Sequence, residues 1–182
     1  MIELDRDIFL FLNSLNTPWL DQIMRVVSMR VVWIPFYAVM VWLLSTRYGK
    51  RVWIPLVLVP VLIVITDQGS GLLKNLFERL RPCHEPDLAG LVHTVNGRCG
   101  GMYGFVSAHA ANSFGIAAFT APLIRKRWYT WLVVFWALLV SYSRIYLGVH
   151  YPGDIIGGAL LGILAGAGLA WVAGKMDKNI KQ

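Results

Sequence analysis

An arginine, a histidine and an aspartate stand close together between two long apolar runs, at Arg144, His150 and Asp154. A carboxylate near a histidine can accept a hydrogen bond from one imidazole nitrogen, which leaves the other nitrogen free as a nucleophile. The arginine adds a permanently charged fork that matches phosphate oxygens. A helix that begins near Pro152 would add free N–H groups that attract an anion. The pattern predicts nucleophilic chemistry at an anionic group, although the three residues would also fit a structural ion-pair corner at a membrane surface.

A second group of polar residues precedes this stretch. Ser107 is placed as an N-cap at the start of an apolar run, which puts His109 in the first helical turn. Lys74 and Arg81 are seven residues apart and therefore share one helix face. Placing a cation at the edge of the hydrocarbon layer costs free energy unless the cation is paired or has a function. The alternative is that these long side chains extend to the lipid headgroups. Two histidines at one surface predict a division of labour, in which one attacks and the other protonates the leaving group.

These residues lie in a chain too apolar for an ordinary soluble domain. Of its 182 residues, 57% are hydrophobic, 15% are charged and eight are tryptophan. The net charge of +7 gathers between apolar runs, which is the positive-inside pattern of a multi-spanning membrane protein and argues against nucleic acid as a partner. The basic clusters are Arg47, Lys50 and Arg51, then Arg125, Lys126 and Arg127, then Lys175, Lys178 and Lys181.

The hydrophobic pattern predicts an all-α fold, a polytopic membrane helix bundle of about five to six spanning helices with an N-terminal amphipathic helix. Residues 1–16 carry an apolar stripe at helical spacing with acids opposite, and residues 19–30 form a mixed segment that leads into the membrane. The clear spans are residues 31–46, 52–80, 107–124, 128–147 and 152–174. The last span contains Gly158, Gly162 and Gly166, which we interpret as a packing ridge.

The basic clusters also predict an orientation. If they are cytoplasmic, residues 81–106 and 148–153 face outward, and the reactive groups gather at that face. Acidic residues occupy the N-terminus where a basic region would stand, so no cleavable signal peptide is predicted. Cys83 and Cys99 fall in the first outer loop, where a disulfide would contribute about 3 kcal/mol; the alternative is two free thiols. His84, Glu85 and His93 in the same loop are expected to be solvated or to touch a headgroup.

Three short motifs in order then resemble a known family. Lys74-x6-Arg81-Pro82, Ser107-x-His109 and Ser143-Arg144-x5-His150-x3-Asp154 resemble the signature of the type 2 phosphatidic acid phosphatase (PAP2) superfamily, membrane lipid phosphatases related to vanadium haloperoxidases. The resemblance covers roughly residues 50–175 and implies one domain over 1–182, with a catalytic core at 50–175 and an interfacial region at 1–30. The family's second motif usually reads Pro-Ser-Gly-His, whereas this chain has Val106-Ser107-Ala108-His109.

The resemblance implies a role for each matching residue. His150 would attack phosphorus and form a phosphohistidine, Asp154 would orient it, and His109 would protonate the departing oxygen. The phosphate would be held by the remaining motif residues and by backbone N–H groups: Lys74, Arg81, Ser107, Ala108 and Arg144. The family needs neither metal nor other cofactor, and this chain lacks the carboxylate cluster of a Mg²⁺ site. The implied partners are the bilayer and a phosphorylated lipid, while the oligomeric state is left open.

Other functions fit the pattern less well. A channel or transporter would place charge at mid-depth or on both faces, where only Asp67 lies here, and an inactive lipid-binding subunit would leave the histidines without a role. A haloperoxidase fits poorly because a membrane site favours a lipid over a soluble oxidant. The chain is expected in the bacterial cytoplasmic membrane, with the site facing outward and the C-terminus inside. Undecaprenyl diphosphate is the favoured substrate, with phosphatidylglycerol phosphate, phosphatidate and lipid A phosphates as alternatives.

Overall fold

The computed structural model describes residues 2–179, and these fold into seven α-helices with short 3-10 turns between them. The prediction of an all-α fold is confirmed. Met1, expected in the N-terminal helix, and Lys181, expected in the C-terminal basic cluster, lie outside the described residues.

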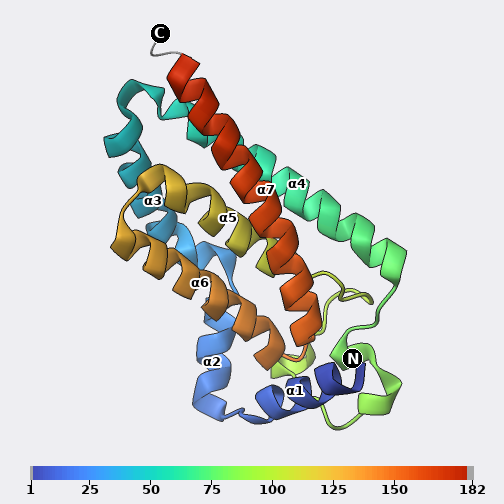
Figure 1. Ribbon diagram of the computed structural model, residues 1–182. Helices are drawn as coiled ribbons and strands as arrows, with labels where there is room; N and C mark the ends of the chain where they lie inside the picture. Colours follow the sequence, from blue (N-terminus) through green and yellow to red (C-terminus); the bar gives the residue numbers. More distant parts are fainter. Residues whose placement is uncertain (1, 180–182) are drawn as a thin grey trace.

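Five of the helices form an elongated bundle (Figure 1). They are α3 (Ile34–Tyr48), α4 (Trp53–Phe77), α5 (Ala108–Ile124), α6 (Arg127–Tyr146) and α7 (Pro152–Asn179). The central helix is α5, which packs against the other four. Its Phe119 is fully buried in the main apolar cluster, together with Leu43 of α3, Leu62 of α4 and Tyr129 of α6.

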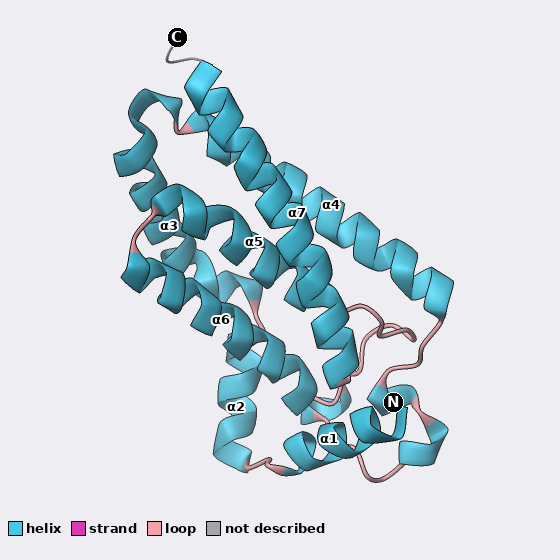
Figure 2. Ribbon diagram, viewed as in Figure 1, coloured by secondary structure: helices cyan, strands magenta, loops and turns pink. Residues whose placement is uncertain are grey.

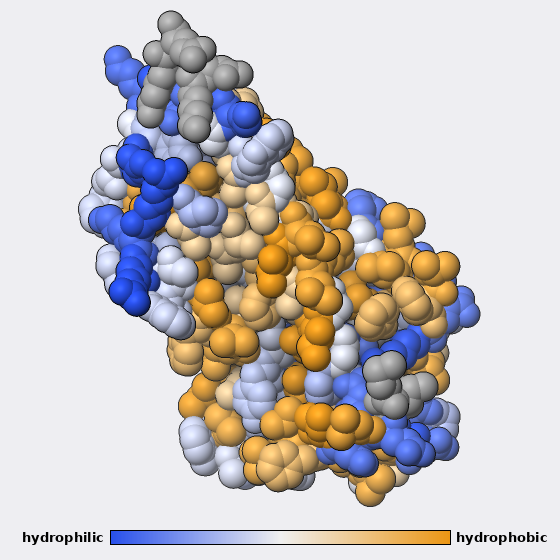
Figure 3. Space-filling view, viewed as in Figure 1, coloured by the Kyte–Doolittle hydropathy of each residue, from blue (hydrophilic) through white to orange (hydrophobic). Residues whose placement is uncertain are grey.

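The surface of this bundle is apolar, as a lipid-facing surface must be. Large apolar side chains on four of the five helices point outward, including Trp42, Leu76, Trp131 and Leu164. Apolar residues form a broad band across the face seen in Figure 3. Among the described residues, three stretches are long and apolar enough to cross a membrane: Arg30–Arg51, Trp53–Phe77 and Pro152–Asp177. Helices α5 and α6, also expected as spans, complete the same bundle; α5 has 17 residues and is mostly buried by its neighbours.

The packing of α5 against α7 depends on the predicted glycine ridge. Gly158, Gly162 and Gly166 stand one helical turn apart on α7, and each meets the backbone of α5. A Cβ atom on Gly162 would overlap the carbonyl oxygen of Ala111, and similar overlaps would occur at the other two glycines. The ridge therefore brings two backbones together, which confirms its interpretation as a packing feature.

Helices α1 (Ile2–Ser14) and α2 (Pro18–Val27) lie across one end of the bundle (Figures 1 and 2). The side of α1 that faces the protein carries the buried Phe9 and Asn13, and the Asn13 amide donates to the Tyr146 carbonyl oxygen at 2.8 Å. Its apolar stripe points away, with Leu4 and Phe11 about two-thirds exposed (64% and 65%). This arrangement suits a helix whose apolar face rests in a bilayer.

The loop between α4 and α5 covers the same end of the bundle (Figure 2). It contains three 3-10 turns, at Pro82–His84, Pro86–Leu88 and Val95–Gly97, and a disulfide joins Cys83 to Cys99 with their Cα atoms 5.9 Å apart. His93 was expected to be solvated or at a headgroup, but its Nε2 lies 2.9 Å from Asp21 Oδ1 on α2. That expectation was wrong. The contact could not be foreseen because Asp21 is 72 residues away in the sequence and only the fold brings it near His93.

Candidate active site

His150 and Asp154 lie together at the start of α7. His150 is in the turn between α6 and α7, Asp154 is in the first turn of α7, and both side chains are buried. The His150 Nδ1 atom is 3.3 Å from Asp154 Oδ2, which also accepts the Tyr151 backbone N–H at 3.1 Å. Because a carboxylate only accepts hydrogen bonds, this pairing places the imidazole proton on Nδ1. The Nε2 atom then has the free lone pair that a nucleophile needs.

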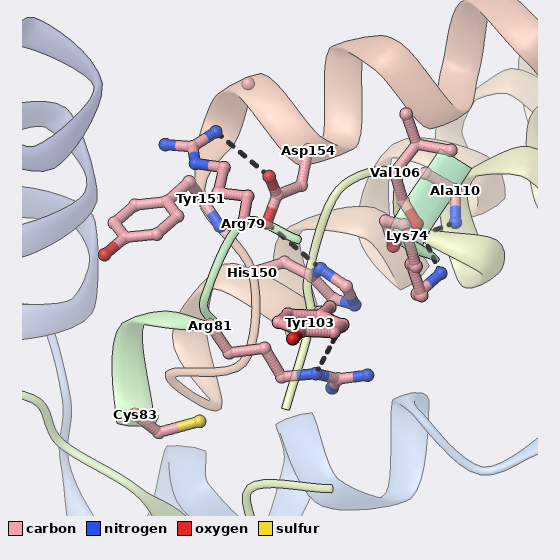
Figure 4. A network of polar contacts seen from close by, with 12 residues as sticks. Lys74, Arg79, Arg81, Cys83, Tyr103, Val106, Ala110, His150, Tyr151 and Asp154 are labelled. Carbon is pink, nitrogen blue, oxygen red and sulfur yellow. Dashed lines mark hydrogen bonds and ion pairs between the residues drawn. The ribbon is translucent and has the colours of Figure 1, made fainter. Parts of the chain in front are cut away.

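The other oxygen of Asp154 is held by Arg79, a residue that the motifs did not single out. Arg79 Nη1 is 3.0 Å from Asp154 Oδ1 (Figure 4). Arg79 Nη2 is 2.6 Å from Asp5 Oδ2 on α1. Its guanidinium also stacks 4.2 Å from the centre of the Tyr151 ring. Asp5 in turn accepts the Gly153 N–H at 2.8 Å, so the first helix of the chain is tied to the start of the last one.

Lys74 lies near the end of α4, and Arg81 lies in the loop that follows. The expectation that they share one helix face was wrong, because α4 ends at Phe77 with Glu78 in a left-handed conformation. Lys74 Nζ donates to the Val106 carbonyl oxygen at 2.5 Å, and Arg81 donates to Tyr103 at 3.1 Å and to Cys99 at 3.2 Å, again at carbonyl oxygens. Figure 4 shows the Arg81 side chain running below the Tyr103 and His150 side chains. Within residues 2–179, neither cation is paired with a carboxylate. Neutral carbonyl groups hold them in place and leave their charge for an anion.

Ser107, Ala108 and His109 enter from the start of α5. Ser107 caps the helix as predicted, because its Oγ accepts the Ala110 N–H at 3.4 Å, while its own N–H donates to the Asp154 carbonyl oxygen at 3.0 Å. Ala108 is the first helical residue, and a helical backbone conformation is open to alanine. The departure from glycine in this motif therefore needs no unusual backbone.

Arg144 enters from the last turn of α6. Its guanidinium donates to the Ser28 hydroxyl, and its buried Nε has no partner within the described part of the chain. Asp67, which the sequence places at mid-depth, accepts a hydrogen bond from the Asn112 amide at 2.9 Å.

The surroundings of His150 favour its uncharged form. Burial lowers its pKa well below the ordinary value of 6.5, and the nearby positive charges of Arg81, Arg144 and Lys74 lower it further, against a smaller opposing effect of the Gly104 backbone. At neutral pH the imidazole is therefore neutral, and its nitrogen lone pair is free to attack an electrophile.

A cavity of about 290 Å³ lies beside His109, between the bundle and the segment that joins α2 to α3. Its walls are mainly apolar, with Trp33, Ile63, Ile116 and Trp136 among them. The arrangement combines a buried nucleophile, a second histidine, several cations and an apolar space. It fits a reaction at the phosphate of a molecule that has a hydrophobic part.

Comparison with known proteins agrees with this chemistry. A profile of the PAP2 superfamily matches residues 52–177, which is more than half of the chain. The chain belongs to the PAP2 superfamily. The PAP2 match contains each of the three motifs, and the resemblance seen in the sequence is confirmed.

Individual PAP2 proteins are similar over most of the chain. A lipid A 4'-phosphatase of Bacteroides thetaiotaomicron is 39% identical over 182 residues, covering 98% of this chain and 81% of that protein. An undecaprenyl-diphosphatase of Sulfolobus acidocaldarius is 34% identical over 131 residues, covering 72% of this chain and 58% of that protein. The crystal structure of a PAP2-type phosphatidylglycerolphosphate phosphatase from Bacillus subtilis superposes with a TM-score of 0.70 at 26% identity, covering 99% of this chain and 87% of the other.

Proposed function

We propose that this PAP2 protein is a metal-independent phosphatase that removes a phosphate group from a membrane lipid through a phosphohistidine intermediate. The observation that carries the proposal is the buried pair of His150 and Asp154, surrounded by the fixed charges of Lys74, Arg81 and Arg144. These cations would attract the phosphate and supply the positive charge that metal ions supply in other phosphoryl-transfer sites.

In the first step, the Nε2 atom of His150 bonds to phosphorus while the bond from phosphorus to the lipid oxygen breaks. His109 gives a proton to that oxygen, and the dephosphorylated lipid leaves. In the second step, water attacks phosphorus, His109 takes a proton from the water, and the P–N bond breaks to release inorganic phosphate. Asp154 holds the Nδ1 proton and stabilises the positive charge that develops on the imidazole during attack.

The remaining motif residues would stabilise the transition state. Lys74, Arg81 and Arg144 would bind the phosphate oxygens, and Ser107 and the Ala108 N–H would complete the cradle at the start of α5. Arg79 has a different task, because its two hydrogen bonds go to carboxylates. It would act as a positioning residue that fixes Asp154.

The substrate proposal is a phosphate monoester on a glycolipid of the lipid A type. Its support is the lipid A 4'-phosphatase similar to this chain over nearly its whole length. Undecaprenyl diphosphate, favoured by the sequence alone, is the second candidate because of the similar undecaprenyl-diphosphatase. In both cases the apolar cavity beside His109 would receive part of the lipid chain. The three basic clusters support a site on the outer face of a bacterial cytoplasmic membrane.

The test is phosphate release by the detergent-purified protein in excess EDTA, across lipid A, undecaprenyl diphosphate, phosphatidylglycerol phosphate and phosphatidate. We expect EDTA-resistant release that is greatest with lipid A and lost in His150→Ala. A matched control is His84→Ala, because His84 is a half-buried loop histidine outside the proposed site, with its Nε2 3.2 Å from the Gly100 carbonyl oxygen. A ³²P-labelled substrate should label the wild-type protein in an acid-labile form.

Each result separates the alternatives. Release that depends on added metal would contradict the proposed chemistry, and a clear preference for the diphosphate would make the second candidate the substrate. No release from any lipid, by protein shown to be folded, would identify an inactive lipid-binding member of the family.

A further inference from the structure

A second cavity lies at the end of the bundle opposite the histidine site. It has a volume of about 700 Å³ and is bounded by the end of α3, the turn Gly49–Arg51 and the C-terminal halves of α5 and α7. Helix α4 begins beside it at Trp53 and reaches Lys74 after 21 residues, or about 30 Å at 1.5 Å per residue. None of the proposed catalytic or phosphate-binding residues lines it. It is therefore a separate feature.

Positive charge dominates the lining of this cavity. Four cations face it, namely Arg47, Lys50, Arg51 and Arg125, against the single carboxylate of Asp177. Asp177 lies 2.9 Å from Arg51 Nη1. The other three cations are exposed, and none of them is paired with a carboxylate within residues 2–179. The three cations without such a partner carry like charges around one space, and an anion that enters it would reduce their mutual repulsion.

The rest of the lining is apolar and close to the lipid-facing surface. Small residues such as Ala118, Ala167 and Ala170 form one wall. Beside them Trp171 is 67% exposed, with Lys175 Nζ 5.4 Å from its ring centre. An exposed tryptophan near a lysine at the end of a spanning helix is typical of the headgroup level of a membrane. Figure 3 shows hydrophilic residues gathered at this end, above the apolar band.

We propose that this cavity binds a phosphate group supplied by the headgroup of an anionic membrane lipid, in the leaflet opposite the histidine site. Arginine forks match phosphate oxygens, and basic pockets between spanning helices are a known way to hold anionic headgroups. The small apolar residues accommodate the glycerol and the first carbons of the chains. The proposal does not depend on the reaction proposed for His150.

The test is native mass spectrometry of the detergent-purified full chain with phosphatidylglycerol, phosphatidylcholine or inorganic phosphate. Arg47→Gln/Lys50→Gln removes two cations of the cavity. Lys126→Gln/Arg127→Gln removes the same two residue types at the start of α6, where both are exposed and outside the cavity lining. We expect phosphatidylglycerol to bind more tightly than phosphatidylcholine, and the first variant, but not the second, to weaken its binding by about 30-fold.

A second variant tests whether the volume of the cavity, as distinct from its positive charge, is needed for binding. Ala167→Phe keeps all four cations but narrows the cavity from its exposed, apolar wall, and it should also weaken phosphatidylglycerol binding. Equal binding by the two double variants, or undiminished binding by Ala167→Phe, would overturn the proposal. Inorganic phosphate that binds as tightly as the lipid, with the same dependence on Arg47 and Lys50, would show that the ligand is a soluble anion and not a headgroup.

Discussion

The contact between α5 and α7 allows the positioning of the site to be tested with one added methyl group. In Gly162→Ala the new Cβ would overlap the Ala111 carbonyl oxygen, so the helices must separate by about 1 Å to restore C···O distances of roughly 3.3 Å. Because α5 carries His109 and α7 carries Asp154, this movement separates the two sides of the site. A displacement of about 1 Å can reduce a rate about 100-fold, and we expect a loss of that size in kcat.

The same substitution has a smaller effect on stability. Overpacking costs about 1–3 kcal/mol, and the better helix propensity of alanine offsets about 1 kcal/mol of it. Gly168→Ala is the matched control on the same helix, because its added Cβ would meet no atom beyond the adjoining backbone of α7 within 4 Å, and it should keep full activity. Phosphate release and thermal unfolding are measured in the same detergent. Wild-type kcat in Gly162→Ala would refute the view that this contact sets the geometry of the site.

Three further predictions concern single features of the site and its loop. Arg79→Gln should lower kcat about 10- to 100-fold with little change in KM, because a hydrogen bond to a charged group contributes about 1.5–3 kcal/mol. The control Arg6→Gln, which breaks the ion pair with Asp87, should leave kcat unchanged. Equal kcat values in the two variants would count against a positioning role for Arg79. Reduction of Cys83–Cys99 should lower the melting temperature, since closing a loop with a sequence separation of 16 contributes about 3 kcal/mol; an unchanged value, with oxidation beforehand verified by mass, would contradict this. The lowered pKa of His150 means that its ¹⁵N chemical shifts should stay those of a neutral imidazole as the pH falls through 6.5, and a midpoint near 6.5 would disprove the effect of burial.

Features that depend on neighbouring residues were predictable from the sequence. Ser107 caps α5 and α7 begins at Pro152, because caps and first-turn prolines act within a few positions of themselves. The four-residue spacing of His150 and Asp154 likewise predicted that they lie together at the start of α7, where His150 Nδ1 is 3.3 Å from Asp154 Oδ2. The glycine ridge was also predictable from the sequence, because its spacing of four residues places every glycine on one helix face.

Features that join distant segments were not predictable in this way. Arg79 stands two residues before a motif arginine, but nothing near it in the sequence indicates that Asp5 and Asp154 would both accept its hydrogen bonds. The pairing of His93 with Asp21 was missed for the same reason. Both contacts depend on how α1 and α2 lie across the end of the bundle, and hydrophobic periodicity carries no information about that placement.

The outward apolar face of α1 has a consequence for the order of events during biosynthesis. Asp5 is made 74 residues before Arg79 and 148 residues before Gly153, the two groups to which it hydrogen-bonds. At translation rates of 5–20 residues per second, α1 waits roughly 7–30 s for its last partner. A helix that needed the protein to cover its apolar stripe would be prone to aggregation in that interval, whereas α1 can rest on the bilayer at once. The proposed site lacks His150 and Asp154 until the start of α7 has been made, so we expect shorter nascent chains to have no hydrolytic activity.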